Sequence, residues 1–178
     1  MTDAPAPGLT LTLRCPLRWL DQAPGTPGEV AARALEVLER LEALEERPHT
    51  LDDDPALGRE LARLERKLDT VLDLLGALLD SARPRPPATA VELRAHALAW
   101  EAVPGAAPPA GARGWIELSL SELPWPLVLA AQVTGTDGAG RTEAVLPDAS
   151  ETLTDALSRL IFRRHRRAVA STRKPALS

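Results

Sequence analysis

The sequence predicts an α+β protein: a small antiparallel β-barrel with an inserted helical pair and a C-terminal helix. Apolar residues recur at every second position in residues 9–13 and again between residues 88 and 146, as in half-buried strands. Between these segments, and after residue 148, the apolar period becomes that of an amphipathic helix. Because the strand residues are too small to fill a deep sandwich, a small barrel or curled sheet is favoured.

Composition excludes several classes of protein. The chain has 178 residues, a net charge of −4 and one cysteine, Cys15, which excludes a disulfide framework and a thiolate zinc site. No apolar run approaches the ~20 residues of a membrane span. Residues 1–8 are acidic and rich in proline, unlike a signal peptide, so we expect a disordered start and a cytoplasmic protein.

Residues 9–22 are predicted to form the first barrel strand and a linker. Leu9 to Leu13 alternates apolar residues with threonines, which is typical of a half-buried strand. Pro16 is expected to end this strand or to place it on a sheet edge, because proline donates no ladder hydrogen bond. Trp19 and Leu20 follow as an anchor onto an apolar surface.

A helical insertion is predicted over residues 28–82. The apolar stripe of its first helix runs from Glu29 to Arg47, where Pro48 stops it. In the second helix Asp54 is placed to cap the free amides, and Pro55 fits the first helical position. This helix is expected to continue to about Ala82.

Within the second helix, residues 55–81 carry a heptad pattern. Its apolar residues are spaced alternately by four and three, which averages 3.5 residues and indicates a supercoiled seam. The predicted oligomerisation residues are Leu57, Leu61, Leu64, Leu68, Val71, Leu75 and Leu78. Leu72 and Leu79, next to the seam, favour more than two strands. The alternative is an intramolecular hairpin in which the second helix packs on the first and on the barrel.

Residues 88–168 are predicted to complete the barrel and add the last helix. Ala90–Glu101 is expected to be one long strand with a possible bend in its middle. Further strands are predicted at 115–121, 127–133 and 141–146, with a glycine-rich hairpin turn at 136–140. Asp148 and Glu151 then form a start like a capping box, and residues 169–178 are expected to be a disordered tail.

A small barrel followed by a helix ending in LSRLIFRRHRR resembles the PilZ family, bacterial domains of cyclic di-GMP signalling. The resemblance covers Leu9–Leu20 and Ala88–Arg167. The long heptad helix before the main strands is similar to that of non-standard tetrameric PilZ proteins of xanthomonads. In those proteins the inserted helix builds a parallel four-stranded coiled coil. The resemblance therefore implies a PilZ-like barrel and a homotetramer.

The ligand motif of the PilZ family is degenerate in this sequence. The family binds cyclic di-GMP with an RxxxR segment and a D/NxSxxG turn. Arg14 and Arg18 match the first in spacing. In the second, Ser119 fits, but Glu117 is longer than the expected acid or amide, and Glu122 replaces the glycine. Glu122 adds negative charge where a dianionic ligand would lie, so the pattern argues against cyclic di-GMP binding.

No enzyme, cofactor or metal signature is present in the sequence. His49, His96 and His165 have no metal-ligand spacing, and no phosphate-binding glycine loop or nucleophile motif occurs. The basic residues 159–174 lack the interleaved aromatics that stack on bases, which argues against nucleic acid. Trp125, between two prolines, is the best candidate for an exposed partner site.

Together, these features favour a non-enzymatic oligomeric adaptor in bacterial signalling. The predicted role is regulation of motility, attachment or virulence through a protein partner of unknown identity. Three alternatives stay open. The first is a genuine cyclic di-GMP receptor that uses Arg14 and Arg18, and the second is a coiled-coil scaffold unrelated to PilZ. The third is an enzyme, which would require an active site that the sequence does not show.

Overall fold

A computed structural model describes residues 9–45, 55–82, 86–102, 107–123 and 125–172 of the chain. The predicted disordered start at residues 1–8, the stop at Pro48 and the cap at Asp54 lie outside the described residues. None of the helices in the described ranges is long and apolar enough to cross a membrane.

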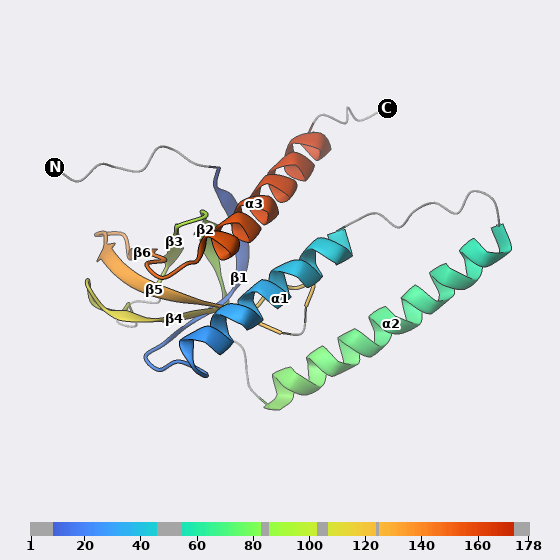
Figure 1. Cartoon of the computed structure of the whole chain (residues 1–178), viewed down its shortest axis with the longest axis horizontal. Helices are drawn as coiled ribbons and strands as arrows, with labels where there is room; N and C mark the ends of the chain where they lie inside the picture. The colour runs from blue at the N-terminus through green and yellow to red at the C-terminus, as the bar shows by residue number, and fades with distance from the viewer. Residues whose placement is uncertain (1–8, 46–54, 83–85, 103–106, 124, 173–178) are drawn as a thin grey trace.

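Six antiparallel strands close into a barrel, which confirms the predicted fold class (Figure 1). Around the barrel their order is β1-β2-β3-β6-β5-β4. The strands are β1 (Leu11–Leu20), β2 (Ala88–Leu93), β3 (Ala97–Glu101), β4 (Arg113–Leu118), β5 (Leu127–Thr136) and β6 (Arg141–Val145). Leucine, valine and isoleucine side chains from the strands fill the interior, as expected when alternate residues point inward.

The first strand is longer than predicted because Pro16 does not end it. Up to Pro16, β1 pairs with β2, and from Leu17 onward it pairs with β4. Pro16 thus lies where the strand changes neighbours, and its carbonyl accepts a hydrogen bond from the Ser119 N–H (3.0 Å). A missing N–H is tolerated there because the ladder to β2 ends at this residue. Trp19 is therefore part of the strand.

The predicted long strand at residues 90–101 is in fact two strands. The chain reverses between β2 and β3, where the Arg94 N–H donates to the Ala97 carbonyl (2.8 Å). This reversal places Val91 opposite Trp100 on the same inward face, and both side chains are buried. A single strand would have put these two residues on opposite faces. The sequence around Arg94 carries no glycine or proline to mark the turn.

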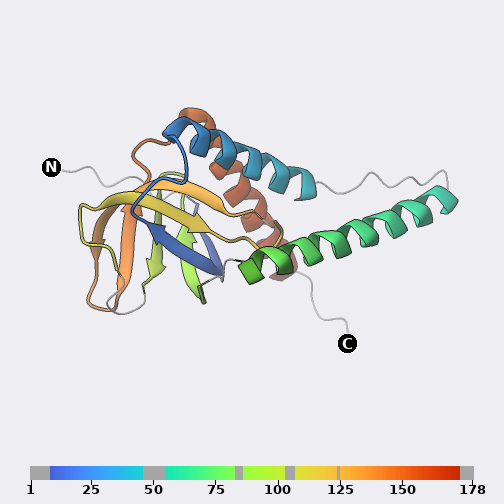
Figure 2. The same ribbon diagram turned by 90° about the horizontal axis from the view of Figure 1, so that it is seen from below.

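Two helices cover one side of the barrel. Helix α1 (Pro27–Glu45) packs against β5 and against α3 (Glu151–Thr172), and Figure 2 shows both helices lying over the strands. Helix α1 begins with a capping box, because the Thr26 N–H donates to Glu29 Oε2 (2.8 Å) and the Glu29 N–H donates back to the Thr26 hydroxyl (3.4 Å). The hydrogen bonds that the Glu29 carboxylate accepts from the Thr26 N–H and hydroxyl lower the pKa of Glu29.

The last helix differs from the prediction at both ends. Ser150 caps it, since its hydroxyl accepts a hydrogen bond from the Leu153 N–H (3.2 Å). The helix continues to Thr172 rather than ending near residue 168. Arginine and alanine are good helix formers, which favours continuation of the helix past residue 168. The rest of the predicted tail, residues 173–178, lies outside the described part of the chain.

Helix α2 (Pro55–Ala82) extends away from the barrel in both views (Figures 1 and 2). Its 28 residues make a rod about 42 Å long at 1.5 Å per residue. The predicted alternative of a packed helical hairpin does not occur among the described residues, since α1 packs on β5 and α3 instead of α2. The apolar face of α2 is therefore open to solvent in the single chain.

Candidate functional site

The antiparallel pairing of β1 with β4 brings the two halves of the candidate ligand motif together. Arg18 lies directly opposite Glu117, and its Nη1 is 3.7 Å from Glu117 Oε1. Arg14 and Arg18 are four residues apart on one strand, so both project from the same, outward face. The large sequence separation between Arg18 and Ser119 is thus bridged by the fold.

Each arginine of this pair already contacts a protein oxygen. The Arg14 guanidinium donates to the carbonyl of Ala88 (3.3 Å), and Arg18 forms its ion pair with Glu117. Glu117 is only 8% exposed, so its carboxylate neutralises Arg18 in a partly desolvated position. A phosphate at Arg18 would have to displace or approach this carboxylate, which costs free energy.

The loop after β4 is held by the last helix. Arg164 donates to Glu122 Oε1 (2.8 Å), and the hydroxyl of Ser121 donates to the other oxygen of Glu122 (3.1 Å). Glu122, predicted only as an obstacle to a ligand, thus has a structural partner that the sequence analysis missed. Leu120 and Leu123 bury their side chains in the core and fix the loop from the inside.

Cys15 lies behind this loop, with its side chain buried in the barrel core. Desolvation raises the pKa of its thiol to about 11, partly offset by the nearby Arg164 cation and reinforced by the Glu122 carboxylate. A thiol in that protonation state is a poor nucleophile at neutral pH.

A second surface links the same loop to α1. Arg40 stacks over the ring of Trp125 at 4.5 Å from its centroid and also donates to Glu36. Trp125 is 40% exposed, in line with the prediction from its two flanking prolines. The contact of Arg40 with Trp125 was not predicted from the sequence, because only the fold places the two side chains together.

The third feature is the apolar face of α2. Residues three and four apart share one face of a helix, so the heptad residues form a continuous stripe. The seam residues with described side chains are 40–64% exposed: Leu61, Leu64, Leu68, Val71, Leu75 and Leu78. The side chain of Leu57 lies outside the described part of the chain. Leu74, beside the seam, is 66% exposed.

The barrel and its helices agree with a known family. Residues 32–174 match the atypical PilZ domain, a family described as a cyclic di-GMP receptor. This match spans most of the chain, which therefore belongs to the atypical PilZ family. The predicted resemblance to PilZ is confirmed, and the alternative of a coiled-coil scaffold unrelated to PilZ is wrong.

A solved structure extends this result beyond the matched residues. The chain is similar to a pathogenic protein from Xanthomonas campestris, described as a new tetrameric PilZ domain self-assembled via an unusual helical bundle. The two share 30% sequence identity and superpose with a TM-score of 0.71, over 93% of this chain and 90% of the Xanthomonas protein. No curated protein sequence matches the chain.

Proposed function

We propose that this protein is a non-enzymatic PilZ signalling adaptor that assembles into a homotetramer through α2. The observation that carries the proposal is the exposed leucine stripe of α2, which faces no other element among the described residues. Monomeric proteins rarely leave such a contiguous apolar surface in water. The self-assembly described for the Xanthomonas relative supports a helical bundle as the arrangement.

The free energy gained by burying the seam of α2 is of the same order as the cost of association. Burying each seam side chain contributes about 1.5–3 kcal/mol, and every chain brings at least the six described seam residues to the interface. Association costs roughly 4–15 kcal/mol in lost rigid-body freedom. For the six residues this amounts to at most about 9–18 kcal/mol per chain, which overlaps the cost of association, and apolar residues beside the seam add further contact surface.

The assembly is tested by light scattering on the intact chain and on Leu64→Asp/Leu68→Asp. We expect a tetramer for the intact chain and a monomer for the double variant, because two carboxylates in each seam cannot be buried unpaired. The matched control is Arg59→Gln/Arg66→Gln, which changes the net charge equally on the opposite face and should stay tetrameric. A monomeric intact chain, or an unchanged mass in the seam variant, contradicts the proposal.

The adaptor role follows from clustering several barrels in one particle. A partner that contacts more than one barrel gains avidity without any new contact, since its second binding event is intramolecular. We propose that such partners are proteins of a cytoplasmic bacterial signalling system that controls motility, attachment or virulence. The family description as a cyclic di-GMP receptor supports a role in signalling.

A genuine cyclic di-GMP receptor is the second candidate. One observation favours it. Arg14 and Arg18 share the outward face of β1, and β1 pairs with β4, the strand that leads to Ser119. Against it, Glu117 and Glu122 already engage arginines at this position. Calorimetric titration with cyclic di-GMP decides between them. No heat is expected, whereas binding that Arg14→Ala or Arg18→Ala abolishes establishes the receptor.

A further inference from the structure

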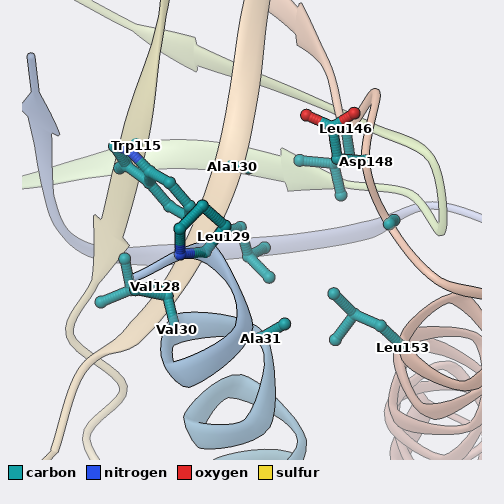
Figure 3. A pocket seen from close by; sticks show the side chains of 11 residues that line it. Val30, Ala31, Trp115, Val128, Leu129, Ala130, Leu146, Asp148 and Leu153 are labelled. Carbon is teal, nitrogen blue, oxygen red and sulfur yellow. The ribbon is translucent and has the colours of Figure 1, made fainter. Parts of the chain in front are cut away.

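A cavity of about 130 Å³ opens between the start of α1, strands β4 and β5, and the segment that joins β6 to α3 (Figure 3). Its walls are made of small and aliphatic side chains, among them Val30, Ala31, Val128, Ala130 and Leu153. An apolar cavity of about 150 Å³ accepts a molecule the size of benzene. This cavity therefore has room for one branched aliphatic side chain.

Two polar groups border the cavity at different ends. Figure 3 shows the carboxylate of Asp148 on the side of the β6–α3 segment and the indole of Trp115 on the side of β4. Within the described part of the chain, the Asp148 carboxylate and the Trp115 indole N–H have no protein partner and are accessible to solvent. The cavity thus offers one free acceptor with negative charge and one free donor around an apolar centre.

The charged side chain at the edge of the cavity is anionic. Asp148 is the one charged residue among those that line it. Glu29 and Glu151, in the first turns of the two flanking helices, add negative charge nearby. The Glu29 carboxylate is already bonded to Thr26, whereas Asp148 is exposed. A positively charged group beside the apolar cavity therefore finds its partner in Asp148.

We propose that this cavity binds a segment of a partner protein in which a leucine- or isoleucine-sized side chain is followed by lysine or arginine. The aliphatic group fills the cavity, the cation pairs with Asp148, and a backbone carbonyl accepts the Trp115 indole N–H. Three contacts of these kinds around one cavity match a peptide better than an isolated amine or hydrocarbon. The proposal rests on the adaptor role, for which it supplies the chemistry of the partner.

The cavity and the apolar face of α2 are separate surfaces of the chain. The cavity lies where α1 begins against the barrel, whereas α2 extends away from the barrel in both overall views (Figures 1 and 2). A tetramer would then present one such cavity on every subunit. Weak single contacts of this size become useful through avidity.

The proposal is tested by nuclear magnetic resonance on the intact chain, following the Trp115 indole signal. The probes are the peptides acetyl-Gly-Leu-Lys-Gly-amide and acetyl-Gly-Leu-Gln-Gly-amide. We expect a saturable shift with both peptides and about fivefold weaker binding of the glutamine peptide, the effect of one exposed ion pair. Asp148→Asn should make the two affinities equal.

Two variants separate the cavity from the surface around it. Ala31→Leu fills the cavity from α1 and should abolish the shift. Ala32→Leu makes the same change on the next, exposed residue, which does not line the cavity, and should leave binding unchanged. Equal binding of the two peptides to the unaltered chain, or binding that survives Ala31→Leu, overturns the proposal.

Two further measurements distinguish binding of a peptide from binding of a simple amine, and failure of this proposal from failure of the proposed assembly. Isoamylamine carries the same aliphatic group and a cation without a peptide bond, so binding as tight as that of the lysine peptide overturns the assignment to a protein segment. The Leu64→Asp/Leu68→Asp variant should bind the lysine peptide as the intact chain does. Loss of peptide binding by an intact tetramer contradicts this inference alone, and a monomeric intact chain that binds the peptide contradicts only the assembly.

Discussion

The barrel and α2 use leucine in opposite ways. In the barrel, Leu118, Leu127 and Leu129 are almost completely buried against neighbours from the same chain. In α2 the seam leucines are about half exposed, although they repeat with equal regularity. The apolar pattern therefore predicts that a surface is buried, whereas only the three-dimensional structure shows whether the same chain buries it.

The largest expected effect comes from comparing the stability of two variants, Leu118→Ala in the barrel and Leu68→Ala in α2. We expect Leu118→Ala to destabilise the fold by about 2–5 kcal/mol at every protein concentration, because it leaves a cavity in the barrel core. Leu68→Ala should lower stability in a concentration-dependent way, through assembly alone. Urea unfolding at several protein concentrations makes the measurement. Equal, concentration-independent losses would show that α2 belongs to the fold of the single chain.

The rate at which the Cys15 thiol is labelled measures whether the barrel is closed around it. Its pKa of about 11 leaves roughly 100-fold less thiolate at pH 8 than an ordinary cysteine has. We expect a disulfide reagent to label Cys15 at least that much more slowly than in urea-unfolded protein. Leu64→Asp/Leu68→Asp should leave the rate unchanged if the barrel is independent of assembly. Fast labelling of the folded monomer would show that the barrel depends on α2.

A third test concerns packing inside the barrel wall. A Cβ atom added to Gly114 would lie 2.4 Å from Cζ2 of Trp19, so Gly114→Ala should destabilise by about 1–3 kcal/mol. Gly135 is the matched control on β5, because an added Cβ meets nothing within 4 Å there. Thermal unfolding compares the two. Similar melting temperatures for both variants would show that Trp19 is free to move.

The smallest effect comes from an ion pair on the barrel surface. Arg141 donates to both carboxylate oxygens of Glu92 (2.8 and 2.6 Å), and these hydrogen bonds lower the pKa of Glu92. The stabilisation is thus present above the unfolded pKa of about 4.3 and disappears as the pH falls through the lower folded value. At pH 7, Glu92→Gln should cost no more than about 1 kcal/mol, with no difference near pH 2. A difference that persists in acid contradicts this assignment.

Periodicity predicted most of the fold because burial of one face imposes a spacing on the residues. It did not predict the reversal at Arg94, since that turn contains no glycine, proline or asparagine. It also placed a possible strand end at Pro16, because nothing local shows that β1 exchanges one neighbour for another there. Local patterns report burial and turn chemistry, whereas strand partners are set by the whole barrel.

The candidate site was predicted in its residues but not in its contacts. Arg18 and Glu117 were both identified from the family motif, yet their pairing depends on the register of β1 with β4. The contacts of Arg164 and Arg40 were not predicted, because each meets its partner only through the packing of α3 or α1 on the loop after β4. The cavity at Ala31 and Trp115 had no signal in the sequence, since its walls come from separate elements.

The pairing of β1 with β4 has a consequence for folding. Leu20 pairs with Trp115, roughly a hundred residues later, so the barrel closes only after both helices of the insertion have been synthesised. Until β1 pairs with them, β2 and β4 each lack one neighbour. Chains already joined by α2 would hold unpaired β1 strands next to such edges at high local concentration. The helix proposed to assemble the protein therefore also favours exchange of β1 between subunits.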